Sequence, residues 1–232
     1  MKRLILFLIS FTLLAAQAQT PEQRAEVTLQ TTKGKIILSL YNQTPLHRDN
    51  FLKKVSEGYY DGILFHRIIS QFMIQSGDSA SRSVPANEYF PSEKEDTTRI
   101  PAEFLFPELF HRRGVLAAAR ESDAVNPTRA SSNSQFYIVW GKYFSPRDMR
   151  EMQEKVYERE DSTTHVTFPK EVIDAYEIDG GTPHLDGNYT VFGEVIKGLD
   201  VVGNIQDVKT DSLDRPLKDV RIKKAWISKP LK

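Results

Sequence analysis

The sequence predicts a mainly β fold built on an antiparallel sheet or barrel. Short segments in which apolar and polar residues alternate recur along the chain, as in Val27–Thr31 and Lys35–Tyr41. Helical spacing is confined to a few segments, and short strands with few helices are typical of antiparallel architectures. With 232 residues, of which 40% are hydrophobic, the chain suits one domain with a substantial core.

The first two strands form a predicted hairpin. Val27–Thr31 and Lys35–Tyr41 flank Lys33-Gly34, a pair that suits a tight turn, so the apolar sides of both strands should face one core. A last alternating strand around Val220–Ile227 is expected to pair with this hairpin and to seal a barrel.

A helix is predicted directly after the hairpin. Thr44 is expected to cap it, with Pro45 at the first helical position and Gly58 after its end. The helix should cover one end or one face of the sheet. Its inward-facing residues recur at a spacing of four: His47, Phe51 and Val55.

The central stretch contains two short apolar strands, Ile63–Ile69 and Phe72–Gln75, separated by Ser70-Gln71. Arg67 is the anomaly in it, because arginine is rarely buried without a partner. Its side chain either reaches solvent from the outer face of a half-buried strand or points into a polar site. The strand pattern alone leaves both interpretations open.

Two further strands are predicted, one containing Ala117-Ala118-Ala119 and one over Gln135–Trp140. The three small side chains suit either the close approach of another backbone or tight packing in a core. Ser79–Arg99 and Glu121–Ser132 are polar and are predicted to be loops. After Gly193 the chain should complete a strand and form a short helical turn before the last strand.

The segment of residues 142–182 is predicted to hold two short helices. Ser145 and Asp148 form a capping box for the first, and Gly180-Gly181 closes the second. Neither apolar stripe is broad enough to build a core without the barrel, so we expect an appendage and not a separate domain. The stripes contain Met149, Met152 and Val156, then Val172, Ile173 and Tyr176.

The composition excludes several function classes. Beyond residue 18 there are 29 basic and 31 acidic residues, a balance that attracts neither nucleic acid nor an anionic membrane. Without cysteine, the chain has no thiol nucleophile, and there is no Gly-x-Ser-x-Gly elbow of a serine hydrolase. No metal and no cofactor are expected, because the histidines lack close metal-ligand spacing: His47, His66, His111, His165 and His184.

Residues 1–18 have the pattern of a secretory signal peptide. Lys2 and Arg3 precede the apolar run Leu4–Ala16, and Ala16-Gln17-Ala18 supplies the small-x-small cleavage pattern. The run is shorter than the roughly 20 residues that span a bilayer. We therefore expect an exported chain without membrane attachment in its mature form, in the periplasm or alternatively in the medium.

Three ordered motifs carry a resemblance to a known family. The first runs from Phe65-His66-Arg67 through Phe72-Met73 and Gln75 to Gly77-Asp78, the second is Ser132–Ile138, and the third is Leu185–Gly193. Together they resemble the signatures of the cyclophilin family of peptidyl-prolyl cis-trans isomerases, over about residues 27–227. The resemblance implies a closed eight-stranded antiparallel barrel with two flanking helices, to which this chain adds an inserted helical appendage.

The resemblance implies an enzyme that accelerates rotation about X-Pro bonds in exported polypeptides without a cofactor. The barrier is about 20 kcal/mol because amide resonance must be broken. Arg67 would stabilise the twisted amide, whose nitrogen regains a lone pair, because a guanidinium stays protonated and offers donors in a fixed fork. The implied catalytic residues are Arg67, Phe72 and Gln75, and the implied substrate-binding residues are Met73, Ala119, Arg120, Gln135, Tyr137, His184, Leu185 and Tyr189.

Four residues depart from the usual pattern of that family. Arg120 stands where an asparagine is usual, although that contact is made mainly by the backbone. Tyr137 replaces a phenylalanine and adds a hydroxyl that needs water or a partner. His184 takes the place of an aromatic residue, commonly tryptophan, that matters for cyclosporin, so weak drug binding is expected. Tyr189 stands where histidine is common and tyrosine occurs in some bacterial members.

Two stretches appear longer than the family pattern needs, residues 79–99 and 142–182, and the second is expected to lie along the peptide groove. A peptide-binding or chaperone module with weak turnover is the alternative function. Retention of Arg67 beside Phe72, Gln75 and Gln135 favours the enzyme, since a binding groove alone needs no donor over the amide. The expected partners are proline-containing polypeptides, bound by a monomer.

Overall fold

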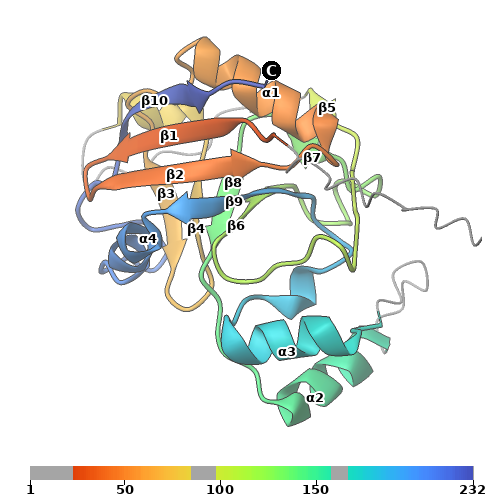
Figure 1. Ribbon diagram of the computed structural model, residues 1–232. Helices are drawn as coiled ribbons and strands as arrows, with labels where there is room; N and C mark the ends of the chain where they lie inside the picture. Colours follow the sequence, from red (N-terminus) through yellow and green to blue (C-terminus); the bar gives the residue numbers. More distant parts are fainter. Residues whose placement is uncertain (1–22, 85–97, 158–166, 232) are drawn as a thin grey trace, which may run out of the picture.

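The computed structural model describes residues 23–84, 98–157 and 167–231. The predicted signal peptide and most of the loop of residues 79–99 therefore lie outside the described residues. Eight strands form one antiparallel sheet in the order β10-β1-β2-β9-β6-β8-β4-β3 (Figure 1). These strands are β1 (Glu26–Thr31), β2 (Lys35–Leu40), β3 (Phe65–Ile69), β4 (Met73–Ser76), β6 (Val115–Ala118), β8 (Phe136–Val139), β9 (Val191–Lys197) and β10 (Ile222–Lys229).

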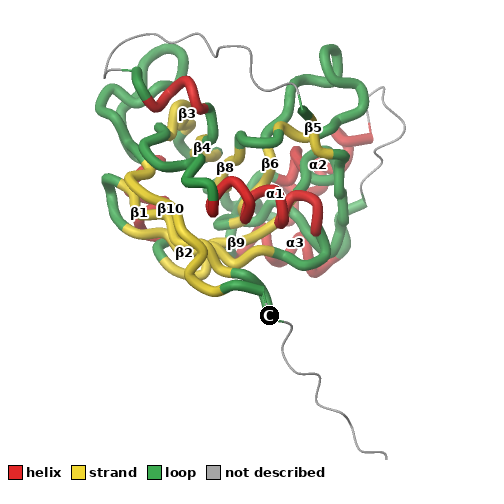
Figure 2. Tube along the Cα trace, turned by 90° about the horizontal axis from the view of Figure 1, so that it is seen from above, coloured by secondary structure: helices red, strands yellow, loops and turns green. Residues whose placement is uncertain are grey.

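Four α-helices and a small second sheet accompany the large sheet in the described residues. Seen from above, α1 lies across one end of the curved sheet (Figure 2), while α2 and α3 lie together below it (Figure 1). The small sheet pairs β5 (Arg99–Ile100) with β7 (Ser131–Ser132). The helices are α1 (Pro45–Ser56), α2 (Pro146–Tyr157), α3 (Lys170–Ile178) and α4 (Leu199–Gln206).

The predicted closed barrel is wrong in one respect, because the sheet is an open half-barrel. The last strand pairs with the first hairpin as expected, since β10 lies antiparallel to β1. No ladder joins β10 to β3 at the other edge, however. The two edges meet only near the isolated bridge Leu64–Arg221, where Phe65 N–H donates to the Val220 carbonyl at 2.8 Å. Farther along β3, Ile68 N–H donates to the Asp214 carbonyl of a loop at 2.8 Å and not to β10, so pairing stops after the bridge.

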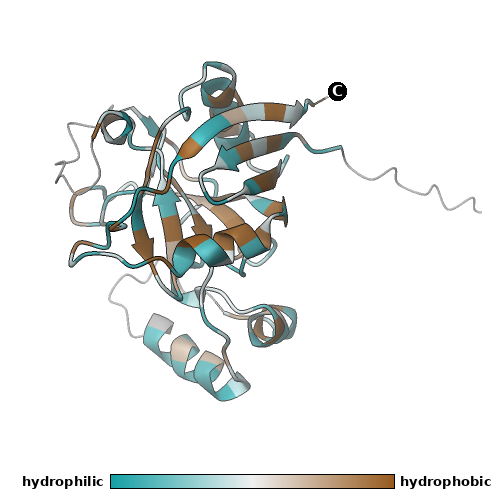
Figure 3. Cartoon of the chain, turned by 90° about the vertical axis from the view of Figure 1, so that its left-hand side faces the viewer, coloured by the Kyte–Doolittle hydropathy of each residue, from teal (hydrophilic) through white to brown (hydrophobic). Residues whose placement is uncertain are grey.

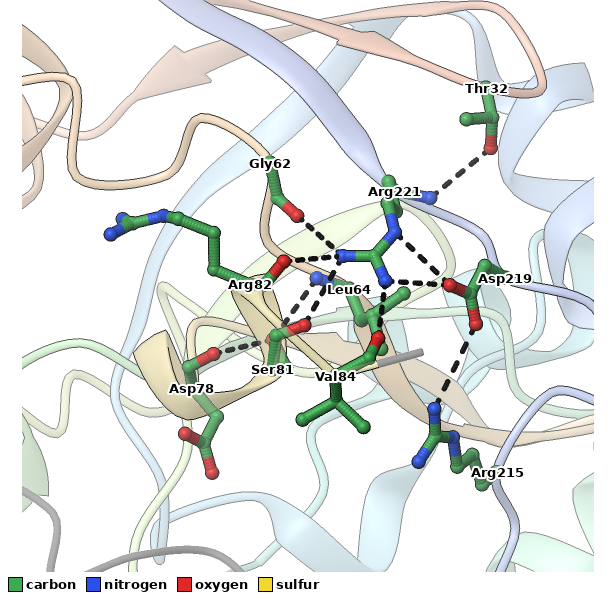
Figure 4. Close-up of polar contacts among 10 residues, drawn as sticks. All are labelled: Thr32, Gly62, Leu64, Asp78, Ser81, Arg82, Val84, Arg215, Asp219 and Arg221. Atoms are coloured by element: carbon green, nitrogen blue, oxygen red, sulfur yellow. Dashed lines mark hydrogen bonds and ion pairs between the residues drawn. The ribbon is translucent and has the colours of Figure 1, made fainter. Parts of the chain in front are cut away.

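One guanidinium holds the seam together (Figure 4). Nη1 of Arg221 donates to the carbonyl of Gly62 at 2.9 Å and Nη2 donates to that of Val84 at 2.7 Å. The same side chain also reaches the carbonyls of Ser81 and Arg82, and Nη2 lies 2.6 Å from the Asp219 carboxylate. A single side chain therefore fastens the segments before β3 and after β4 to the start of β10.

Helix α1 begins at Pro45, as predicted, but its cap is different. Thr44 makes no side-chain capping hydrogen bond. Instead, the Glu103 carboxylate accepts from the backbone N–H groups of Leu46 and His47, each at 3.1 Å. A carboxylate at this end also opposes the helix dipole favourably. The prediction failed because the capping residue lies 57 positions away in the sequence.

Side chains alternate between two cores along the central strands. Ile74, Leu116 and Ile138 point into the inner core, which α1 and α4 cover with Phe51 and Val202. The intervening residues form a second cluster on the opposite face, called here the pocket-side core. It contains Tyr41, Met73, Val115, Ala117, Tyr137, Val139 and Val191. Alternating apolar and polar bands along the strands are visible in Figure 3.

The described residues of the segment 142–182, called here the helical unit, share a small core with the segment before β6. The capping box is present, since Ser145 N–H donates to Asp148 Oδ2 at 2.8 Å. Phenylalanines from the segment before β6 complete the core, which the periodicity of the two helices could not reveal. Its members are Met149, Phe168, Val172 and Tyr176, packed against Phe106, Phe110, Phe144, Met152 and Ile173.

The helical unit leaves and rejoins the sheet through a narrow neck. Gly181 N–H donates to the Lys142 carbonyl at 2.7 Å, and Thr182 N–H donates to the His111 carbonyl at 2.9 Å. A Cβ atom on Gly141 would lie 2.1 Å from the Gly181 carbonyl oxygen, and one on Gly181 would lie 2.2 Å from that of His111. Only glycine allows the backbones to approach this closely.

The seam provides a test of the fold. Arg221→Ala leaves carbonyl groups and the Asp219 carboxylate without their donor, so the free energy of unfolding should fall by about 2 kcal/mol or more. Arg221→Lys keeps the positive charge but not the planar set of guanidinium donors, so its free energy of unfolding should fall by less. Urea unfolding measures both. A loss below about 0.5 kcal/mol for the alanine variant, the range of ordinary surface changes, would contradict this role.

Candidate active site

The site is built on one row of residues across four strands. Arg67 of β3 pairs with Gln75 of β4, Gln75 pairs with Tyr137 of β8, and Tyr137 pairs with Ala117 of β6. Directly paired residues point to the same face of a sheet. The row thus brings the Arg67 guanidinium, the Gln75 amide and the Tyr137 ring to one face of the sheet, opposite the inner core.

A cavity of about 200 Å³ opens on this face of the sheet. It is smaller than the roughly 300–1,000 Å³ pockets that take whole drug-sized ligands, so it suits one ring of a longer chain. Nine of the eleven predicted site residues line it, drawn from the three motifs and from the strand of alanines. They are Arg67, Phe72, Met73, Gln75, Ala119, Arg120, Tyr137, Leu185 and Tyr189.

The other two predicted residues touch lining residues without lining the cavity themselves. Gln75 Nε2 donates to Gln135 Oε1 at 2.8 Å. The His184 ring stacks on Phe72, with ring centroids 5.4 Å apart and planes inclined by 27°. Gln135 therefore orients Gln75, and His184 extends the wall that Phe72 forms.

Both sequence interpretations of Arg67 hold in part. Its side chain is 45% exposed and still lines the cavity. Nε donates to Asp214 Oδ2 at 3.3 Å, and Ile68 N–H fixes the same loop by donating to the Asp214 carbonyl at 2.8 Å. Asp214 could not be predicted from the sequence, because nothing in a polar loop 147 residues away marks it as the partner of Arg67.

Arg120 lines the cavity in place of the usual asparagine, and its side chain is held by its neighbours. Its guanidinium carbon lies 4.4 Å from the centre of the Tyr189 ring, and Nε donates to the Asn188 carbonyl at 2.8 Å. Only 4% of the side chain is exposed. The long side chain is thus held against the wall that Tyr189 forms.

The Tyr137 hydroxyl has the partner that its replacement of phenylalanine required. Its oxygen lies 2.9 Å from Nε2 of His111, and the two rings stack with centroids 6.1 Å apart. Both residues are buried. The sequence analysis assigned His111 no role, and its position 26 residues before Tyr137 carries no signal that could have revealed this contact.

His66 lies beside Arg67 on β3 and has a strongly shifted pKa. The pKa of its imidazole is lowered to about 4, mainly by burial; the Asp78 charge opposes this shift and the Arg67 charge adds to it. Burial also lowers the pKa of His47, against the opposing effect of Glu103. The folded protein thus keeps both imidazoles neutral at pH values where ordinary histidines take up a proton.

The geometry defines a small cavity beside the Arg67 guanidinium, of a size that suits one ring of a peptide. Comparisons with known proteins identify the family to which the chain belongs. Residues 26–227 match the family model described as cyclophilin type peptidyl-prolyl cis-trans isomerase/CLD. The chain belongs to the cyclophilin-type peptidyl-prolyl cis-trans isomerase family.

Relatives support this assignment over most of the chain. A Staphylococcus aureus (strain COL) protein, named provisionally as a peptidyl-prolyl cis-trans isomerase, is 33% identical over 85% of this chain and 88% of its own. A Staphylococcus epidermidis protein with the same name is 31% identical over 87% of this chain and 90% of its own.

A solved structure shares the fold. The cyclophilin type peptidyl-prolyl cis-trans isomerase of Cryptosporidium parvum aligns with a TM-score of 0.60 and 22% identity, over 90% of this chain and 100% of its own. A second structure of that protein, determined in the presence of the dipeptide Ala-Pro, aligns with a TM-score of 0.60 and 23% identity, over 88% of this chain and 99% of its own.

Three further observations concern the described residues. In the described ranges, no three His, Asp or Glu side chains gather as a group that could hold a metal ion. None of the helices in those ranges is both long and apolar enough to span a bilayer. No described residue of the helical unit lines the cavity, so the expected position along the groove is not seen there.

The shifted histidines predict a pH dependence of stability. In the unfolded chain His66 binds a proton near pH 6.5, but in the folded chain only near pH 4, so stability is lost as the pH falls through that window. The His66 contribution to the free energy of unfolding should therefore drop by roughly 3 kcal/mol between pH 7 and 4, since each pKa unit corresponds to about 1.4 kcal/mol. His66→Gln should show a smaller drop, measured by urea unfolding at each pH. An unchanged slope in this variant would contradict the assignment.

Proposed function

We propose that the protein accelerates rotation about X-Pro bonds by a non-covalent mechanism in which Arg67 stabilises the twisted amide. The observation that carries this proposal is the row of Arg67, Gln75 and Tyr137 over one small cavity. It combines a permanent donor with apolar walls of the size of a single ring. The Cryptosporidium relative, studied with Ala-Pro, adds support for a proline-containing ligand.

In the binding step, the cavity holds the proline ring of the substrate. Phe72, Met73, Tyr137 and Leu185 offer apolar surface, of which Met73 and Tyr137 are buried in the pocket-side core and therefore rigid. Ala119 also lines the cavity, and its backbone would hold the residue before proline in an extended form. Fixing both sides of the amide lets the enzyme act on rotation about one bond.

The rate acceleration is assigned to Arg67. Rotation out of the amide plane removes resonance and returns a lone pair to nitrogen, which can then accept a hydrogen bond. A donor that acts only on the twisted state raises kcat and does not merely tighten binding. The ion pair with Asp214 does not prevent this, since both side chains are about 40% exposed and such pairs contribute little free energy.

The cellular role proposed is assistance to the folding of exported proteins, in the periplasm or after release. Proline isomerisation takes tens of seconds without a catalyst and is a slow step for such proteins. The pattern of residues 1–18 supports export, and the near-neutral charge of the chain fits a polypeptide substrate better than nucleic acid.

Arg67→Ala tests the mechanism. The fold should persist, because the side chain is half exposed, and kcat/KM for a short X-Pro peptide should fall by about 100-fold or more, as when one preorganised donor is removed elsewhere. Cis-to-trans conversion of the peptide is followed directly, with peptide binding measured in parallel.

Arg147→Ala is the matched control, since this arginine is 80% exposed on α2 and pairs with Glu151 on its own helix. It should leave kcat/KM unchanged. Equal turnover by the wild type and Arg67→Ala would remove Arg67 from the mechanism. Binding of the peptide by the wild type without any acceleration would instead support the peptide-binding module as the function.

The stacked His184 predicts weak binding of cyclosporin. The imidazole covers less apolar area than the indole usual in the family, although it lies against Phe72 in a suitable orientation. His184→Trp should therefore tighten cyclosporin binding by about tenfold, measured by calorimetry. If the wild type, with His184, already binds cyclosporin as tightly as His184→Trp, this residue does not limit the affinity.

A further inference from the structure

Four buried side chains form a continuous chain of hydrogen bonds from the helical unit to the cavity. The Tyr176 hydroxyl lies 2.6 Å from Asp186 Oδ2, and Asp186 Oδ1 lies 2.8 Å from Nδ1 of His111. Nε2 of His111 lies 2.9 Å from the Tyr137 hydroxyl. Each of the four residues is at least 96% buried. We call this chain the tyrosine relay.

The contacts define the direction of the hydrogen bonds at Asp186. Its oxygens accept, so Tyr176 donates to Oδ2, and both the backbone N–H and Nδ1–H of His111 donate to Oδ1. With Nδ1 of His111 directed at Asp186, Nε2 is the ring nitrogen that pairs with the Tyr137 hydroxyl. Burial raises the pKa of both tyrosines well above the ordinary value, so both hydroxyls keep their protons.

The relay determines what the cavity presents to a ligand. A tyrosine hydroxyl without a partner would have to be solvated, and a water molecule there would compete with an apolar ring. Because His111 pairs with this hydroxyl in the interior, the Tyr137 ring stays available as an apolar wall. His111 also lies edge-on to Tyr189, a second lining residue, with ring centroids 6.4 Å apart.

The far end of the relay belongs to the core of the helical unit. Tyr176 packs edge-on against Phe110 and Phe144, with ring centroids 5.4 and 6.1 Å apart. Its hydroxyl is the direct side-chain link by which this core reaches Asp186 and hence the cavity. The helical unit thus contacts the site through buried hydrogen bonds and not by covering it.

We propose that His111, Asp186 and Tyr176 are positioning residues that fix the Tyr137 wall of the proline pocket and tie it to the helical unit. This inference rests on the proposed isomerase function for its kinetic consequences. It assigns the helical unit a role in substrate affinity, exerted through Tyr137.

Tyr176→Phe is the variant that tests the relay, because it removes one hydroxyl outside the cavity and keeps the ring. The Tyr137 wall contacts the proline ring equally in the ground state and in the twisted state, so a misplaced wall should weaken binding in both. In Tyr176→Phe, KM should therefore rise about fivefold, which corresponds to the free energy of one hydrogen bond, while kcat stays constant. In a Tyr137→Phe background the hydroxyl to be positioned is absent. There, Tyr176→Phe should change KM by less than about twofold.

The control variant is Ser145→Ala, which breaks the capping box of α2 and lowers the stability of the helical unit without touching the relay. It should leave KM unchanged. The inference is overturned if Tyr176→Phe leaves KM unchanged, or if it raises KM equally in both backgrounds, since the effect would then not pass through Tyr137.

An NMR measurement on the protein without substrate tests this inference independently of the proposed function. Tyr176→Phe should shift the ¹H–¹³C NMR resonances of the Tyr137 ring in the full chain, whereas Ser145→Ala should not. If the wild type shows no turnover, the proposed function fails and the relay is judged on these shifts alone. Unshifted Tyr137 resonances in Tyr176→Phe would overturn the relay whether or not the protein is an enzyme.

Discussion

The antiparallel register of β3, β4, β8 and β6 is the constraint on which the site depends. It aligns Arg67, Gln75, Tyr137 and Ala117 on one face, and the next row, including Ile74 and Ile138, on the other. A slip by one residue would turn every side chain to the opposite face. The same apolar contacts that stabilise the inner core therefore hold the donor, the amide and the ring in place, so that the geometry of the cavity is a consequence of core packing.

Arg67 and Tyr137 are supported in opposite ways, and each suits its proposed task. Arg67 is half exposed and held by a single solvent-accessible ion pair, so it can reorient toward an amide nitrogen at little cost. Tyr137 is buried, stacked and hydrogen-bonded to a histidine that is itself fixed by a carboxylate. A rigid wall and an adjustable donor together allow one bond to rotate while its flanking groups are held. Neither requires a proton transfer.

A part of this molecule could be predicted from the sequence when its interacting residues lie close together in the chain. The hairpin, α1 and the strands around Arg67 follow from local periodicity, and the motifs together with the alanine run identified nine residues that line the cavity. Contacts between distant segments left no local signal. These include the Glu103 cap of α1, the Asp214 partner of Arg67, and the seam between β10 and β3. The core of the helical unit was missed for the same reason, because Phe106 and Phe110 precede it by more than thirty residues.

The central claim is that a proline ring occupies the cavity with its amide nitrogen facing the Arg67 guanidinium. A crystal structure of the full chain with a short Ala-Pro peptide tests it most directly. The account predicts the ring against Phe72, Met73 and Tyr137, with an Arg67 nitrogen within about 3.5 Å of the proline nitrogen. A peptide bound with its proline outside this cavity, or with Arg67 still turned toward Asp214 and remote from the amide, would contradict it.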